Sequence, residues 1–219
     1  MINTSIPGWM KLEELTLLSK IAQAVPENGS ILEVGCFLGS STAALYNGKL
    51  PSVKMTVVDN FRGFLDPTLI EKTFRQVNFE MGDPDLYERA KHIAIFSGWQ
   101  KAFKFCVGDD IYNDLDVHPV ASRDFVRDKK YNLTFIDASH YYEDVRNDIK
   151  KFMTDTDLLI GDDFLSIFPG VSQAVNQFRG KRTLIVFENT KLWALVPTSG
   201  YWRDVFKNNN LLFSGETAQ

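Results

Sequence analysis

Aspartate is the residue type that most often follows the short apolar runs of this chain. Five aspartates come at or just after the end of a run that predicts a β-strand: Asp59, Asp109, Asp137, Asp162 and Asp163. One aspartate at such a position is often only a helix N-cap or a turn residue. In an open parallel sheet, however, the carboxyl ends of the strands form the edge where ligands bind. Five carboxylates at one edge therefore favour a ligand site.

Three of these aspartates and one histidine have a spacing that suits proton transfer or metal binding. Asp137 and the pair Asp162 and Asp163 end two strands that we expect to be neighbours, and three carboxylates are a suitable set for Mg²⁺. His140 follows Asp137 by three residues on the same loop, and an imidazole suits a general base near neutral pH. The alternatives are that the aspartate pair caps a helix and that His140 is a turn residue bonded to Asp137.

A glycine-rich turn follows the first predicted strand and precedes a helix. Gly35 allows the backbone to turn sharply, and Gly39 allows a ligand to come close to the helix N-terminus. A dinucleotide site would need G-x-G-x-x-G, and the turn reads G-C-F-L-G instead. Glu33, just before the turn, is unlike a pyrophosphate site and suits a cationic ligand such as the ammonium group of an amino acid.

The elements that must position these residues alternate between short apolar runs and longer amphipathic segments, which is typical of βαβ units. The predicted strands cover residues 30–34, 55–58, 103–107, 133–136 and 158–161, and the main predicted helices cover residues 40–46, 141–153 and 171–178. Residues 184–187 and 192–196 predict an antiparallel hairpin. The expected fold is α/β: a doubly wound, Rossmann-like domain with a mostly parallel sheet of about seven strands and this hairpin at its C-terminal end.

The length of 219 residues fits a single domain over 1–219. Within it, residues 1–29 predict a helical cover at the N-terminus, with Leu15 and Leu18 among the apolar residues at helical spacing. Residues 60–101 predict a helical insertion that a Gly-Asp-Pro sequence at 82–84 interrupts.

Composition limits the expected partners. The net charge is −4 and the basic residues are scattered, so we expect no binding to nucleic acid. The sequence shows no signal-peptide pattern and no apolar stretch of about 18 residues, so we expect no membrane contact. Two isolated cysteines suit a reducing compartment, which favours the cytoplasm. The expected partner is a small-molecule acceptor, and a homo-oligomer stays open.

The turn sequence E-V-G-C-F-L-G-S-S, residues 33–41, resembles the first motif of class I methyltransferases that depend on S-adenosylmethionine (SAM). The resemblance implies a doubly wound methyltransferase domain. It implies a SAM site formed by Glu33, Gly35, Gly39, Ser40, Asp59 and Asp109. In that arrangement Asp59 binds the ribose hydroxyls, Asp109 lies beside the adenine, and Phe61 borders the adenine pocket.

A second block is more distinctive, and with it the resemblance extends over residues 30–178. It reads F-I-D-A-S-H-Y-Y-E-D-V-R-N-D-I, then L-L-I-G-D-D-F, then G-V-S-Q-A-V-N-Q-F. It resembles a bacterial subfamily that includes macrolide-sugar O-methyltransferases and cephalosporin-biosynthesis proteins.

That subfamily implies O-methylation of a sugar or another small hydroxylated metabolite. It also implies that Asp137, Asp162 and Asp163 hold Mg²⁺ while His140, next to the catalytic Asp137, takes the proton. Two rival functions are a non-catalytic protein that binds SAM or a nucleotide, and an NAD-dependent oxidoreductase. The missing G-x-G-x-x-G speaks against the oxidoreductase.

Overall fold

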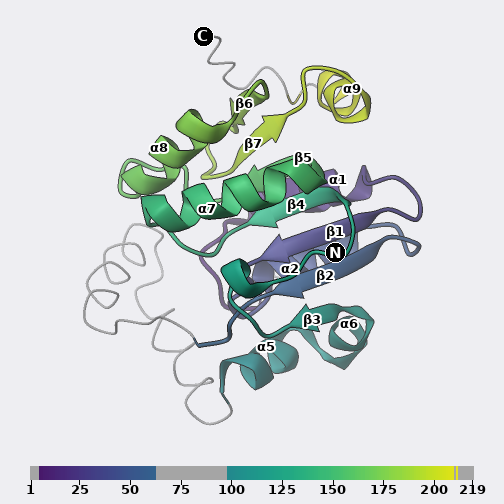
Figure 1. Ribbon diagram of the computed structural model, residues 1–219. Coiled ribbons are helices and arrows are strands. Elements are labelled where there is room, and N and C mark those ends of the chain that lie inside the picture. The colour runs from purple at the N-terminus through teal and green to yellow at the C-terminus, as the bar shows by residue number, and fades with distance from the viewer. Residues whose placement is uncertain (1–4, 63–97, 210, 212–219) are drawn as a thin grey trace.

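The computed structural model describes residues 5–62, 98–209 and 211, and these form a seven-stranded sheet (Figure 1). The strands are β1 (Ser30–Val34), β2 (Lys54–Val58), β3 (Asp116–His118), β4 (Tyr131–Ile136), β5 (Thr156–Gly161), β6 (Thr183–Val186) and β7 (Trp193–Val196). Their order across the sheet is β3-β2-β1-β4-β5-β7-β6. Strands β1 to β5 are parallel, and β7 runs antiparallel to both β5 and β6. The predicted fold class and the C-terminal hairpin are confirmed.

Helices cover both faces of the sheet (Figure 1). The α-helices of the described residues are α1 (Leu12–Gln23), α2 (Ser40–Gly48), α5 (Trp99–Val107), α6 (Asp109–Asp114), α7 (Tyr142–Phe152), α8 (Pro169–Phe178) and α9 (Tyr201–Asn208). Buried residues of α1, α2, α5 and α9 pack on one face, and those of α7 and α8 pack on the other. The domain is thus a three-layer α/β structure.

Strand β5 shows why both faces are covered. Side chains alternate between the two faces of a strand, and here Leu158 and Ile160 join the core beneath α1 while Leu159 joins the core beneath α7 and α8. All three are fully buried. A strand buried on both faces reads as a continuous apolar run, which is why the sequence pattern located β1, β2, β4 and β5 to within two residues.

The predicted strand at 103–107 is wrong, because these residues belong to helix α5. The apolar side chains that pack inward from this segment are Trp99, Ala102, Phe103, Cys106 and Val107. Their spacing of three and four residues is that of a helix, whereas the prediction treated the last five residues as an apolar strand. The third strand along the chain is β3, which has three residues, begins with Asp116 and lies at the edge of the sheet. It is too short to show an alternating pattern.

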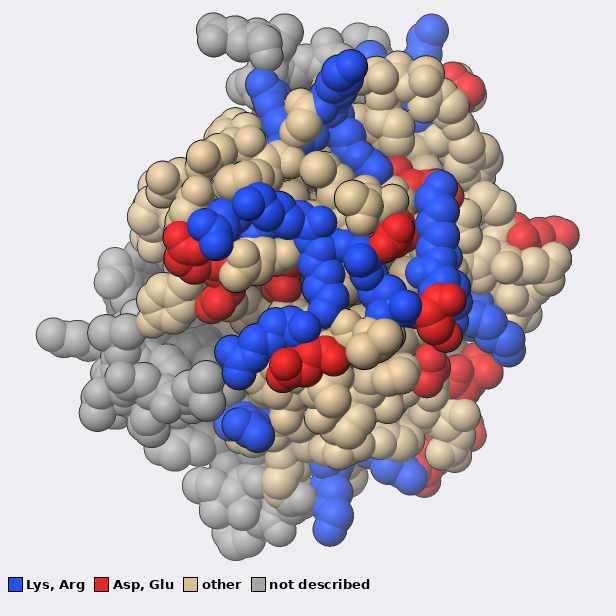
Figure 2. Space-filling view, viewed as in Figure 1, with Lys and Arg blue, Asp and Glu red and all other residues tan. Residues whose placement is uncertain are grey.

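Helix α1 lies within the segment predicted as the N-terminal cover, and its buried residues pack on the sheet. Most of the predicted insertion at 60–101 lies outside the described residues, so its helical character and the division of the chain stay predictions. Where the chain is described, it contains no helix both long and apolar enough to cross a membrane. On the face viewed in Figure 2, basic and acidic side chains lie next to one another. In α7, Arg146 and Glu143 form an ion pair of 2.6 Å.

Candidate functional site

The centre of the site lies at the carboxyl ends of β1 and β4. The chain passes from β1 to β2 on one side and later returns to β4 on the other, so this is the point where strand order reverses and where such sheets bind ligands. Two loops meet there. The N–H of Asp137, after β4, donates to the carbonyl of Val34 in β1 (2.8 Å). A Cβ atom on Gly35, whose φ is +85°, would overlap the carbonyl oxygen of Asp137. Glycine is therefore required where the two loops touch.

Glu33 supports the glycine turn from inside the protein. Its side chain is 0% exposed, and its two carboxylate oxygens accept hydrogen bonds of 2.6 Å from the hydroxyls of Ser41 and Thr42 at the start of α2. Burial raises the pKa of Glu33 to about 7, even though these two hydrogen bonds act to lower it. The expectation that Glu33 faces a ligand's ammonium group does not agree with this enclosure. Its contacts join β1 to α2.

Asp59 connects the end of β2 to the same turn. One carboxylate oxygen accepts from the N–H of Cys36 (2.9 Å) and, at 3.4 Å, of Phe37, and the other accepts from the N–H of Phe61 (2.7 Å). An ionised carboxylate has about four acceptor positions. Asp59 can therefore hold the turn and still accept a hydrogen bond from a ligand hydroxyl. The predicted contact with ribose is compatible with this geometry and stays a prediction.

Gly39 and Ser40 are covered by other parts of the protein. A Cβ atom on Gly39, whose φ is +93°, would overlap a methyl group of Val107 and lie 2.9 Å from the ring of Phe103, both in α5. Ser40 is buried, and a Cβ atom on Gly8 would lie 2.8 Å from it. The sequence analysis predicted that a glycine is needed at position 39 because a ligand comes close there. In the structure the neighbour that requires a glycine there is helix α5.

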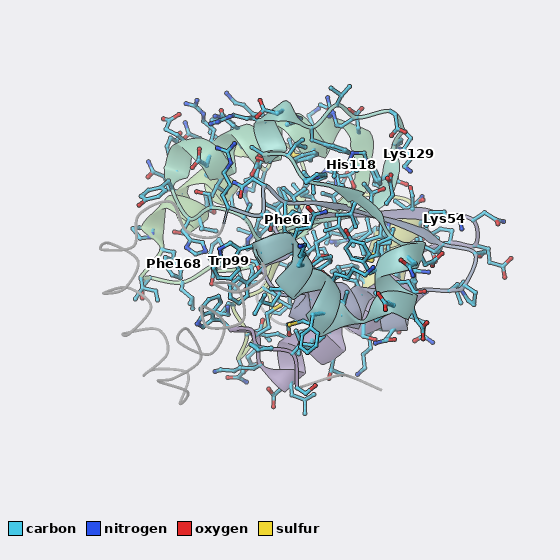
Figure 3. All side chains as sticks on the ribbon, turned by 90° about the horizontal axis from the view of Figure 1, so that it is seen from below. Lys54, Phe61, Trp99, His118, Lys129 and Phe168 are labelled. Carbon is cyan, nitrogen blue, oxygen red and sulfur yellow. The ribbon has the colours of Figure 1, made fainter. Side chains whose placement is uncertain are left out.

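Asp109 does not follow a strand, contrary to the reasoning that selected it. It is the first residue of α6, its side chain is 75% exposed, and its carboxylate lies 3.0 Å from the ammonium of Lys104. Phe61 packs on Phe103, with 5.5 Å between ring centroids. Phe61 and Trp99 lie toward the end of the sheet opposite Lys54 (Figure 3). The contact of Asp109 with adenine stays a prediction, but its position after a strand, which was the reason for choosing it, is wrong.

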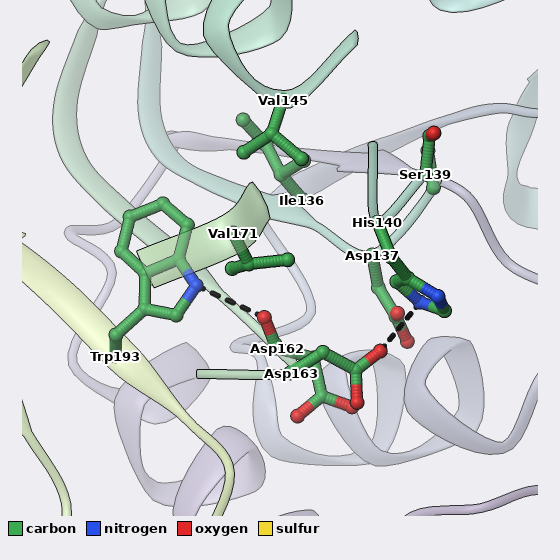
Figure 4. Close-up of a pocket in the computed structure, with 10 residues that line it drawn as sticks. Ile136, Asp137, Ser139, His140, Val145, Asp162, Asp163, Val171 and Trp193 are labelled. Carbon is green, nitrogen blue, oxygen red and sulfur yellow. Dashed lines mark hydrogen bonds and ion pairs between the residues drawn. The ribbon is translucent and has the colours of Figure 1, made fainter. Parts of the chain in front are cut away.

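The other half of the site is a cavity beside the loop that follows β4 (Figure 4). The end of β5, the first residues of α7 and α8, and Trp193 of β7 enclose it. Asp137, His140, Asp162 and Asp163 all line it, so the structure brings together the catalytic and metal-binding residues predicted from the sequence. We call Asp137, Asp162 and Asp163 the acidic cluster.

His140 is held from several directions. Its Nε2 lies 2.6 Å from Oδ2 of Asp163, and its ring packs on Phe168 with 4.1 Å between centroids. A Cβ atom on Gly170, in the first turn of α8, would lie 2.6 Å from the carbonyl oxygen of His140. Sequence reasoning considered Asp137 as the hydrogen-bond partner of His140, but the structure gives that position to Asp163. The backbone of Asp163 has a φ of +62°, an uncommon conformation for a residue other than glycine.

Lys191 is a member of the site that sequence reasoning missed. Its Nζ lies 2.8 Å from Oδ2 of Asp162 and 3.2 Å from Oδ1 of Asp163, and its side chain is 11% exposed. It lies in the loop between β6 and β7, where a lysine would ordinarily be solvated. The pairing of Gly161 in β5 with Trp193 in β7 brings this loop to the acidic cluster. The apolar run after Lys191 predicts a strand, but it does not show that this strand, β7, lies beside β5. Without that position, Lys191 could not be placed at the acidic cluster.

The charges in the cluster shift one another's pKa values. Burial raises the pKa of Asp162 to about 7, and the charge of Asp163 adds to this shift. Burial would also raise the pKa of Asp163, but the Lys191 charge and the hydrogen bond from His140 outweigh it and lower that pKa to about 2. Burial and the other two carboxylates raise the pKa of Asp137 well above its usual range. Asp163 is therefore the carboxylate that stays ionised beside Lys191 and His140.

The cluster does not fit Mg²⁺ in the way that the sequence predicts. Among the described residues, the group with metal-ligand spacing is Asp137, His140 and Asp163, whose ligand atoms lie within 4.8 Å of one another. Asp162 is not in it, although its Oδ1 is buried with no hydrogen-bond partner among the described residues. Mg²⁺ prefers oxygen ligands, and this group would use a nitrogen. An imidazole bound to a metal is also not free to act as the base.

Comparisons with known proteins support the fold and do not show a family. No protein-family model matches the chain, and no curated protein matches it by sequence. A structural-genomics protein from Corynebacterium glutamicum aligns with a TM-score of 0.56 at 12% identity, covering 89% of this chain and 85% of that one. An O-methyltransferase from Bacillus cereus in complex with S-adenosylhomocysteine (SAH) aligns with a TM-score of 0.50 at 14% identity, covering 88% and 85%. A cofactor-bound protein from MTB gives 0.51 at 14%, covering 85% and 81%.

The described residues thus have the Rossmann-like fold of a solved O-methyltransferase structure. The identities of 12 to 14% support a shared fold and nothing finer. The resemblance to the macrolide-sugar subfamily stays a prediction.

Proposed function

We propose that this protein is a SAM-dependent methyltransferase that methylates a hydroxyl group of a sugar or another small metabolite. The glycine turn and Asp59 hold the methyl donor, and the acceptor binds beside His140. The cavity between the ends of β4 and β5 and the start of α7 and α8 has room for about one water molecule, so the acceptor binds at its opening and not inside it.

One observation carries this proposal: the donor loop and the acceptor loop touch at the point where strand order reverses. Gly35 belongs to the turn and Asp137 to the loop that carries His140, and their backbones are in contact. Methyl transfer requires the acceptor oxygen in line with the methyl group at about 3 Å. Two adjoining loops, one for each reactant, provide that proximity.

In this proposal the protein removes the proton of the acceptor hydroxyl. SAM already carries a reactive sulfonium, so the protein must orient the two reactants and activate a weakly nucleophilic hydroxyl. Because Nε2 of His140 is bonded to Asp163, Nδ1 is the nitrogen left to take the proton. The acceptor oxygen then bonds to the methyl carbon, and the C–S electron pair stays on sulfur to give SAH. Asp163 orients the imidazole and stabilises the imidazolium that forms.

The sheet gives a reason to prefer SAM over NAD. The common dinucleotide-binding sheet has the strand order 3-2-1-4-5-6. Here the antiparallel strand β7 lies between β5 and β6. The absence of G-x-G-x-x-G from the turn points the same way.

Calorimetric titration with SAM, SAH and NAD tests the donor assignment without a known acceptor. We expect saturable binding of SAM and SAH and none of NAD. Asp59→Ala should weaken SAM binding by about 10- to 100-fold, since a hydrogen bond to a charged group contributes about 1.5–3 kcal/mol. Asp128→Ala, at an exposed position away from the site, is the matched control.

Because Asp59 also holds the turn, Asp59→Asn should be measured beside Asp59→Ala, with circular dichroism to check folding. The amide keeps one acceptor oxygen for the backbone. Saturable binding of NAD but not SAM would refute the proposal. So would a folded Asp59→Ala protein that binds SAM as tightly as the parent.

A further inference from the structure

We infer that Lys191 supplies the positive charge of the acidic cluster and occupies the place that a divalent cation would need, so that the acceptor site works without one. The inference depends on the proposed function only where it assigns the site to acceptor activation. The physical claim concerns Lys191 and the carboxylates around it.

The position of Lys191 is built into the fold. Its backbone N–H donates to Oε1 of Glu14 in α1 (2.8 Å), and its carbonyl accepts from the N–H of Phe164 (2.9 Å). Glu14 is 0% exposed and is itself fixed, because its other oxygen accepts from the N–H of Lys11 (2.7 Å). Elements far apart in the sequence thus hold one lysine over the end of β5.

The ammonium group binds one oxygen atom of each of two carboxylates that a metal would use, and it leaves Oδ1 of Asp162 without a partner among the described residues. Nζ of Lys191 contacts one oxygen each of Asp162 and Asp163, and the second oxygen of Asp163 is bonded to His140. Mg²⁺ bound to these carboxylates would have to lie about 2.1 Å from their oxygens. Two cations that share the same buried carboxylates repel each other strongly in a medium of low dielectric constant. The ammonium of Lys191 therefore opposes the binding of a divalent cation to these carboxylates.

Lys191 acts on the reaction through its neighbour, as a positioning residue. By binding Oδ1 of Asp163, it fixes the carboxylate whose Oδ2 holds Nε2 of His140. That chain of contacts leaves His140 free of a metal and oriented as a base. If a metal replaced Lys191, the group with ligand spacing would include His140 and remove the base.

Titration of the metal-free protein with Mg²⁺ and with Mn²⁺ tests this inference directly. We expect no saturable binding to the wild-type protein at millimolar concentrations. In Lys191→Met, where the ammonium is replaced by an apolar side chain, we expect Mn²⁺ to bind at least about tenfold more tightly, since the two carboxylates lose their cation. Lys151→Met is the matched control, because that ammonium contacts two backbone carbonyls away from the cluster.

Saturable binding of either metal to the wild-type protein, with no gain in Lys191→Met, would overturn the inference. If Lys191→Met does not fold, the wild-type titration decides alone, and saturable binding contradicts the inference. Titration with SAM on the same preparation separates the two proposals. If the wild-type protein does not bind SAM but the two metal titrations give the expected results, only the proposed function is rejected.

Discussion

The two halves of the site differ in how their carboxylates are satisfied. In the glycine turn, Glu33 and Asp59 accept hydrogen bonds from hydroxyls and backbone N–H groups of residues near them in the sequence or in the turn that follows the adjacent strand β1. In the acidic cluster, Asp162 and Asp163 both bind the ammonium of Lys191, which is 28 or more positions away. The carboxylates of the turn are held by uncharged hydrogen-bond donors, and those of the cluster are held by a charged ammonium group.

This difference predicts different consequences of substitution. Changes in the turn should alter folding and donor binding, because its carboxylates hold the backbone in place. Changes in the cluster should alter the reaction, because its charges orient the one imidazole in the site.

His140→Ala should lower the rate of methyl transfer by about 10²- to 10⁴-fold, the usual contribution of a general base. SAM affinity should change little, because His140 contacts neither the turn nor Asp59. Single-turnover transfer of a labelled methyl group to a panel of hydroxylated acceptors measures the rate, and calorimetry measures the affinity. His118→Ala is the control, since His118 also pairs with an aspartate (3.0 Å) but at the end of β3. Full activity in His140→Ala would reject the base.

Gly35→Ala should lower the free energy of unfolding by about 2–4 kcal/mol, within the range of strongly destabilising substitutions. The new Cβ would overlap the backbone of Asp137, in addition to the cost of a positive φ. Gly180→Ala has the matched conformation, with a φ of +60° and its nearest neighbour at 3.9 Å, and should cost about 1 kcal/mol. Urea denaturation of both variants gives the comparison. Equal losses would show that the two loops do not press against each other.

Glu33→Gln should remove part of the pH dependence of stability. The pKa of Glu33 rises from 4.5 to about 7 on folding, so between these values the folded protein holds a proton that the unfolded chain has lost. Stability should therefore fall as pH rises through this window, by about 2 kcal/mol between pH 5 and pH 7. Urea denaturation at both pH values measures the slope. The slope should be smaller in Glu33→Gln and unchanged in Glu13→Gln, which alters an exposed residue.

Sequence reasoning predicted those parts of the fold that a local pattern encodes. Strands β1, β4 and β5 are buried on both faces and read as apolar runs, and the glycine turn and the D-A-S-H loop follow them directly. Helix α5 was mistaken for a strand because a short apolar run has no clear period, and Asp109 was placed at a strand end for that reason.

The interior of the site was harder to predict because it depends on long-range contacts. The aspartates and His140 were found from strand ends, but their pairing was not. The contact between His140 and Asp163 follows from the pairing of β4 with β5, and the place of Lys191 between two carboxylates follows from the position of β7 beside β5. A local pattern contains no information about such a neighbour.

In the proposed arrangement, the donor lies at the carboxyl ends of β1 and β2 and faces the loop of His140. A crystal structure with SAH bound tests it most directly. The account predicts that a ribose hydroxyl lies within hydrogen-bond distance of the Asp59 carboxylate and that the sulfur atom faces residues 137–140. SAH bound elsewhere, or with its ribose beyond the reach of Asp59 and its sulfur turned away from His140, would contradict the account.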